Sequence, residues 1–131
     1  MRTRDVLMGA AIAALLLAPL PVLAADPAGE IVTAQTHADL ASQASDMAGT
    51  QMHLHHALNC LVGPGGPGFD PKNMNPCANS GNGAIPDTAD AAKKKKLEAA
   101  ADTTRAGLAA ADLKTAQKDA TDAATELTAI K

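Results

Sequence analysis

The stretch HADLASQASDMAGTQMHLHHALNCL, residues 37–61, largely decides the fold that the sequence predicts. Its residues recur every seven positions in two series that are offset by three. The two series are His37, Ala44, Gln51 and Leu58, and Leu40, Met47, Leu54 and Leu61. Together they form one stripe of the kind that packs against a neighbouring helix. Because the register continues past Gly49, we expect one continuous helix over about residues 29–61. The alternative is a break at Gly49-Thr50, since glycine weakens a helix by about 1 kcal/mol relative to alanine.

Glycine, proline and asparagine are frequent in residues 62–87, which predicts a long loop. A helical pattern returns at Thr88 and continues to about Ile130, with Asp87 as the expected N-cap. The stretch GLAAADLKTAQ, residues 107–117, predicts a tight turn in which Asp112 caps the last helix. A short connection makes its two helices antiparallel neighbours. The expected fold is all-α, an antiparallel up–down bundle of three helices with one long Gly/Pro-rich loop.

The first residues have the pattern of a secretory signal peptide. Arg2 and Arg4 precede an apolar run over residues 7–17, and small residues suited to cleavage end at Ala24. The alternative is an uncleaved membrane anchor, but the run is short for a span of about 20 residues. We therefore expect a signal peptide over residues 1–24 and a single periplasmic domain over residues 25–131.

Charge and cysteine content narrow the function further. The formal net charge of −3 argues against a nucleic-acid partner. Cys60 and Cys77 are the only cysteines, and in an exported protein a disulfide is the expected pairing. It would stabilise the fold by about 3 kcal/mol on the chain-entropy model. The alternative is a pair of thiolate metal ligands, although the spacing is not that of a zinc ribbon.

Three of the four histidines lie within QMHLHHALNC, residues 51–60. On a helix, Met52, His53 and His56 fall on one side, nearly opposite the leucine stripe, and His55 lies between the two faces. His53 and His56 are one turn apart, a spacing that allows both to bind one ion. Imidazole suits copper, zinc and nickel, and a thioether favours copper. The expected metal ligands are His53 and His56, supported by Met52 and His55. On a continuous helix His37 would lie about 27 Å away from His55 and is excluded.

Two simpler interpretations of the histidines remain open. They form an exposed polar face without a specific role, or one of them caps carbonyls of the loop. Other chemistry is poorly supported, because the sequence has no CxxCH motif for covalent haem and no Gly-rich phosphate loop after a strand. A Cys60–His56 nucleophile would require a free thiolate, which the expected disulfide removes. We therefore expect no enzyme activity and no organic cofactor.

The stretches THADLASQASDMAGTQMHLHHALNCL (residues 36–61) and DLKTAQKDATDAATEL (112–127) resemble the small histidine-rich helical-bundle metal-binding proteins of bacterial periplasms. Residues 51–87, with HLHHALNCLVGP, NPC and GNGAIPD, also resemble a group of uncharacterised exported proteobacterial proteins. The first resemblance implies metal capture by helix-borne histidines, here His37, His53, His55 and His56. The sequence departs from that family in having no histidine after His56.

These observations predict a periplasmic protein that binds or buffers a transition metal ion, copper or zinc, through a helix-borne His/Met cluster. The alternative is a non-catalytic helical interaction module. In that interpretation the disulfide-stapled loop over residues 62–87 binds a protein partner, since long ordered loops are often functional.

Overall fold

The single helix expected over residues 29–61 is two antiparallel helices. In the computed structural model, which describes residues 24–130, α1 spans Pro27–Gln43 and α2 spans Met47–Val62. The break lies at residues 44–46 and not at Gly49-Thr50. Ala44 ends α1 in an extended conformation, and the carboxylate of Asp46 caps α2 by accepting a hydrogen bond from the Gly49 N–H at 2.7 Å. An Asp N-cap satisfies a backbone donor that the first helical turn leaves free, which stabilises the start of a new helix here.

The second half of the domain repeats this arrangement. After the short helix α3 (Ala84–Asp87), α4 spans Ala91–Ala109 and α5 spans Leu113–Thr128. Asp112 caps α5 as predicted, by accepting a hydrogen bond from the Thr115 N–H at 2.9 Å. The prediction that Asp87 caps the preceding helix is wrong. Asp90 caps α4, and Asp87 instead accepts hydrogen bonds from the backbone and side-chain amides of Asn82.

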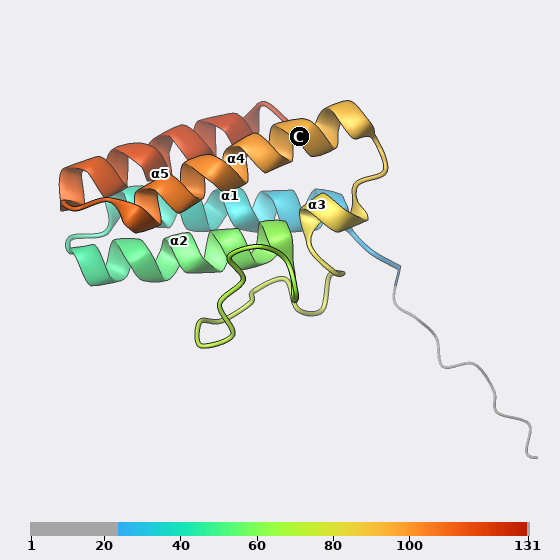
Figure 1. Cartoon of the computed structure of the whole chain (residues 1–131), viewed down its shortest axis with the longest axis horizontal. Coiled ribbons are helices and arrows are strands. Elements are labelled where there is room, and N and C mark those ends of the chain that lie inside the picture. The colour runs from blue at the N-terminus through green and yellow to red at the C-terminus, as the bar shows by residue number, and fades with distance from the viewer. Residues whose placement is uncertain (1–23, 131) are drawn as a thin grey trace, which may run out of the picture.

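The described residues are therefore all helical apart from turns and the loop, as predicted, but four long helices replace the expected three. Figure 1 shows them in an up–down–up–down bundle, with α1 beside α2 and α5, and α4 beside α5 and α2. Every neighbouring pair is antiparallel. The expected loop over residues 62–87 begins at Gly63 and lies at one end of the bundle, where α3 forms its last turn.

Alanines and a few larger aliphatic side chains form the core. Leu54, Leu58 and Leu61 of α2 are fully buried, as the stripe predicts, whereas Leu40 is 42% exposed. The buried residues of the other long helices include Ile31, Ala34, Ala38 and Ala41 in α1, Leu97, Ala101 and Thr104 in α4, and Ala116, Ala120, Ala123 and Leu127 in α5. Small side chains let the helix axes approach closely. At Gly107 of α4 an added Cβ would lie 2.9 Å from Leu54 Cδ1.

Candidate metal centre

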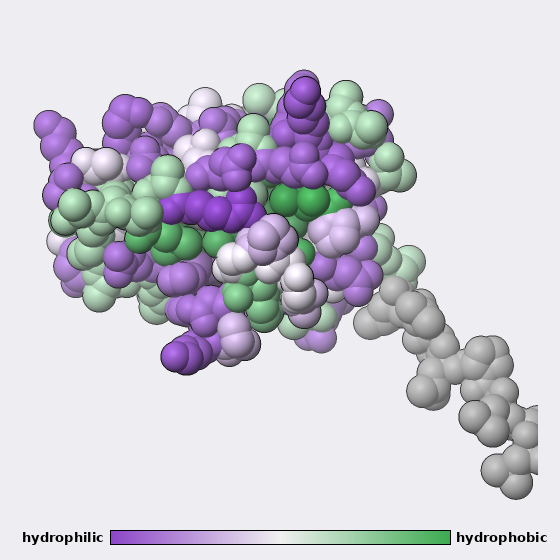
Figure 2. Space-filling view, viewed as in Figure 1, coloured by the Kyte–Doolittle hydropathy of each residue, from purple (hydrophilic) through white to green (hydrophobic). Residues whose placement is uncertain are grey.

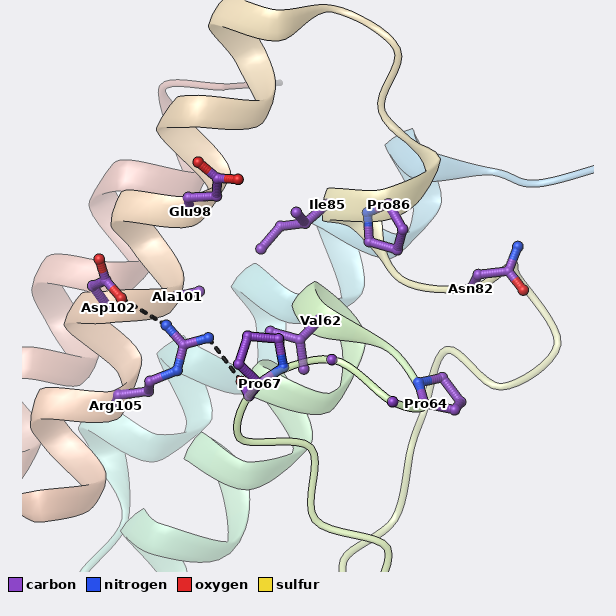
Figure 3. A pocket seen from close by; sticks show the side chains of 12 residues that line it. Val62, Pro64, Pro67, Asn82, Ile85, Pro86, Glu98, Ala101, Asp102 and Arg105 are labelled. Carbon is purple, nitrogen blue, oxygen red and sulfur yellow. Dashed lines mark hydrogen bonds and ion pairs between the residues drawn. The ribbon is translucent and has the colours of Figure 1, made fainter.

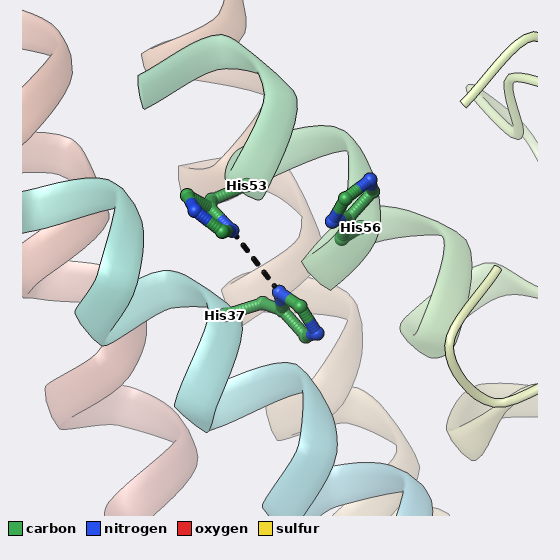
Figure 4. A group of neighbouring side chains, drawn as sticks. All are labelled: His37, His53 and His56. Carbon is green, nitrogen blue, oxygen red and sulfur yellow. Dashed lines mark hydrogen bonds between the residues drawn. The ribbon is translucent and has the colours of Figure 1, made fainter. Parts of the chain in front are cut away.

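Three histidines from two helices meet on the α1–α2 hairpin. His37 of α1 faces His53 and His56 of α2, and the centroids of the three rings lie 5.0–5.7 Å apart. His37 Nδ1 and His53 Nδ1 are 3.2 Å apart, and one ring nitrogen from each residue lies within 4.8 Å of the other two. Figure 4 shows the three rings grouped between the two helices. We call this group the histidine triad.

The turn at Ala44–Asp46 brings these residues together. His37 precedes Ala44 by seven residues and His53 follows Asp46 by seven, so reversal of the chain places them side by side. His56 is three residues after His53 and therefore lies on the same face of α2. The hairpin thus assembles donors that are distant in the sequence on a rigid helical frame.

The prediction that His37 lies out of reach is wrong, because it assumed a continuous helix. The signal for the break is present in the sequence. Ala44-Ser45-Asp46 matches Ala110-Ala111-Asp112, the segment from which the second turn was correctly predicted. The heptad register conceals the first turn, because a stripe facing a neighbouring helix looks the same on one long helix and on two helices folded against each other.

Burial favours the neutral form of His37 and His56. Desolvation, followed by the proximity of His56 and His53, lowers the pKa of His37 from 6.5 to about 4. Burial also lowers the pKa of His56, with smaller contributions from His53 and His55. A neutral imidazole has a free lone pair on one ring nitrogen, so no proton has to be removed before a metal binds.

Two of the ring nitrogens lie about as far apart as two ligands of one small transition metal ion. Zinc binds imidazole nitrogen at about 2.0–2.1 Å, so two ligands of a tetrahedral site lie roughly 3.3–3.4 Å apart. His37 Nδ1 and His53 Nδ1 share a hydrogen bond at 3.2 Å, which is close to that separation, so an ion would replace this bond. His56 Nδ1 is buried and has no hydrogen-bond partner within the described part of the chain. Leaving a buried polar nitrogen without a partner costs free energy. A metal ion that bound this nitrogen would reduce that cost.

The other two predicted ligands lie elsewhere. His55 faces the loop, with its Nδ1 3.7 Å from Asp70 Oδ2, and does not belong to the group of convergent donors. Met52 lies on the outer side of α2 and is 43% exposed. The structure therefore brings together His53 and His56 from the predicted set, adds His37, and leaves His55 and Met52 outside the histidine triad.

Cys60 and Cys77 form the predicted disulfide, with their Cα atoms 5.1 Å apart. Both cysteines are buried, and the bond joins the last turn of α2 to the loop. Asn59 reinforces the connection. Its side-chain amide donates to the carbonyls of Asp70 and Met74 at 3.0 and 3.1 Å, and its carbonyl accepts from the Asp70 N–H at 2.9 Å. The hydrogen bonds and the disulfide hold the loop against α2. Because both cysteines are in the disulfide, neither is free to bind a metal as a thiolate.

A buried carboxylate in α1 was not anticipated from the sequence. Glu30 is fully buried, its Oε1 accepts a hydrogen bond from the Gly83 N–H at 3.0 Å, and its Oε2 has no partner among the described residues. Desolvation, with repulsion from Asp87 and Asp26, raises its pKa from 4.5 to about 7, although the Gly83 hydrogen bond acts in the opposite direction. Glu30 thus connects α1 to the end of the loop and is sensitive to pH.

A hollow of about 650 Å³ is the second candidate site, and it lies between the loop, α3 and α4. Figure 3 shows Val62, Ile85 and Ala101 around it, and Figure 2 shows hydrophobic surface between hydrophilic residues where α4 meets the loop. Arg105 closes one side, where its guanidinium donates to Asp102 Oδ1 at 2.6 Å and to the Pro67 carbonyl at 2.8 Å. The volume of the hollow falls within the range of ligand pockets.

The predicted signal peptide at residues 1–24 lies almost entirely outside the described residues. Within residues 24–130 no helix has the length and apolar character needed to cross a membrane.

Comparison of the chain with protein-family models, with curated proteins and with solved structures gave no significant match. The resemblance to periplasmic metal-binding bundles therefore stays a prediction, and the functional argument depends on the geometry of the histidine triad.

Proposed function

We propose that the protein binds one transition metal ion, zinc or copper, through His37, His53 and His56. The observation that carries this proposal is the convergence of one nitrogen from each of three imidazoles to within 4.8 Å. Three imidazoles at this spacing suit zinc and copper. Met52, which the sequence predicts as a ligand, is not part of the proposed site, because its side chain is 43% exposed on the outer side of α2.

The proposed role is to carry or buffer the ion, without catalysis, in the periplasm. The N-terminal signal pattern and the Cys60–Cys77 disulfide support an exported protein, since structural disulfides persist in oxidising compartments. The histidine triad lies at the side of the α1–α2 hairpin, and His37 and His53 are partly exposed. A site within reach of solvent suits exchange of the ion better than permanent storage.

Calorimetric titration of the purified protein with Zn(II), Cu(II) and Ni(II) tests this proposal. We expect one ion per chain, and a loss of affinity of at least about tenfold in His37→Ala, equivalent to about 1.4 kcal/mol. His55→Ala is the matched control, because it removes an imidazole of the same helix that lies outside the histidine triad. Equal affinities for the wild type and His37→Ala would contradict the assignment.

A second candidate function rests on the hollow between the loop and α4. Its apolar lining, and the disulfide and Asn59 contacts that hold the loop, favour an interaction module that binds a protein partner. A partner captured from periplasmic extract should be lost with Ile85→Asp, which introduces a charge into the hollow, and retained with Asp119→Asn on α5. Capture that depends on His37 and is abolished by a chelator would instead favour the metal site.

A further inference from the structure

Outside the histidine triad, the chain has only one other histidine and two cysteines that could bind a metal ion. The sequence has four histidines and two cysteines. The fourth histidine, His55, lies beside Asp70, and both cysteines are joined in the disulfide. No further imidazole or thiolate of the same chain is therefore available to the ion.

Carboxylates do not complete the site either. Within residues 24–130 no Asp or Glu oxygen joins the three histidine nitrogens in one group. Asp39 is the nearest acidic residue along α1, two positions after His37, and residues two apart on a helix do not face the same side. Its carboxylate accepts a hydrogen bond from the Gln35 side-chain amide.

A metal ion with three protein ligands has a coordination position that the protein does not fill. Structural zinc sites have four protein ligands, whereas sites with three keep a fourth position for water or an exchangeable ligand. The partial exposure of His37 and His53 gives solvent access to the rings, while His56 is only 7% exposed. The accessible side of the histidine triad is therefore on the outer surface of the hairpin.

On the basis of the proposed metal site, we infer that the bound ion keeps one exchangeable coordination position and that an imidazole from outside the chain takes it. The incoming nitrogen forms a bond to the ion as a water molecule leaves, and the three histidines stay bound. Imidazole is a donor that both zinc and Cu(II) accept in proteins, and the three proposed ligands are of this type. Free imidazole and an exposed histidine of another protein share this chemistry. A ternary complex of this kind is the intermediate through which an ion is passed from one protein to another.

Cu(II) and imidazole are the probes for the test. The first step loads the purified protein with Cu(II), removes excess metal by gel filtration and measures the ratio of copper to protein. The second step adds imidazole and follows the visible absorption band and the electron paramagnetic resonance spectrum. We expect a saturable shift of both spectra with the copper still bound to the protein.

Each other outcome contradicts the inference in its own way. Unchanged spectra with copper retained would show a closed site, and copper released without a shifted intermediate would show simple competition; both leave the proposed function intact. Failure to retain copper in the first step would overturn the proposed function together with the inference.

Two controls sharpen the result. His55→Ala should give the wild-type shift, because His55 lies outside the histidine triad. A short peptide containing one histidine, compared with the same peptide containing alanine, distinguishes a side-chain donor from free imidazole. A shift with free imidazole and none with the histidine peptide would exclude a protein side chain as the natural donor.

Discussion

The two hairpins of the bundle have the same turn and carry different side chains. The α1–α2 and α4–α5 connections both end a helix with an extended alanine, Ala44 or Ala110, and begin the next with an aspartate cap, Asp46 or Asp112. Yet the first hairpin holds every histidine and Cys60, whereas the second has neither residue type. The turn determines how two helices pack against each other, and the side chains that face each other across the hairpin determine which ligands it could bind.

The hairpins also differ in what holds them in place. The first is attached to the loop by Cys60–Cys77, Asn59 and Glu30, while the second packs mainly through alanines and reaches the loop through the Arg105–Pro67 hydrogen bond. A hydrogen bond joins the two hairpins near their turns. The side-chain amide of Gln117 donates to the Ala44 carbonyl at 2.8 Å. The first hairpin therefore carries both the candidate metal ligands and most of the contacts that hold the loop.

Of the changes proposed here, removal of the disulfide that holds the first hairpin to the loop should lower the free energy of unfolding most. The bond closes a loop with a sequence separation of 17 residues. Replacing both cysteines with serine should lower the free energy of unfolding by about 3 kcal/mol, because the unfolded chain regains the entropy of that loop. Urea unfolding followed by circular dichroism measures this change. Addition of a reductant to the wild type should reproduce it, and should leave the double variant unchanged.

Glu30 should make the stability of the first hairpin depend on pH between about pH 4.5 and 7. Its pKa is raised to about 7 in the folded protein, so the folded state holds a proton that the unfolded state has lost above about pH 4.5. This contribution is fully present below pH 4.5 and is lost as the pH rises through 7, a change of roughly 3 kcal/mol at about 1.4 kcal/mol per pH unit.

The variant Glu30→Gln keeps the acceptor for the Gly83 N–H and cannot ionise. The difference in free energy of unfolding between this variant and the wild type should therefore grow in favour of the variant from pH 5 to pH 8. Taking the difference removes the opposite effect of His37, whose lowered pKa costs stability as the pH falls below 6.5. A difference that stays constant over this range would show that Glu30 is not protonated in the folded protein.

The aspartate caps should give the smallest and most informative effect. Asp46→Ala and Asp112→Ala each remove a cap and should each cost about 1 kcal/mol of stability. Only Asp46→Ala should also weaken metal binding, because that turn sets the position of His37 against His53. Unfolding curves and calorimetric titrations of both variants test this. Equal loss of metal affinity in the two would show that general destabilisation, and not the turn, controls the site.

The sequence was sufficient for the helical class, the loop, the disulfide and the turn at Asp112. It was misleading at Asp46, because the repeats that end at Leu58 and Leu61 continue in register across a chain reversal. That one error removed His37 from the predicted site. The burial of Glu30 was also beyond the sequence pattern, since it depends on Gly83, which lies 53 residues away in the chain.

The division of the histidine triad between α1 and α2 joins metal affinity to the folded state. In an unfolded chain His53 and His56 remain neighbours, but His37 lies 16 positions before His53 with no structure to bring them together. An ion bound by all three would stabilise the hairpin by mass action and would leave when the hairpin opened. Occupancy by the ion would then measure the fraction of molecules that had completed folding.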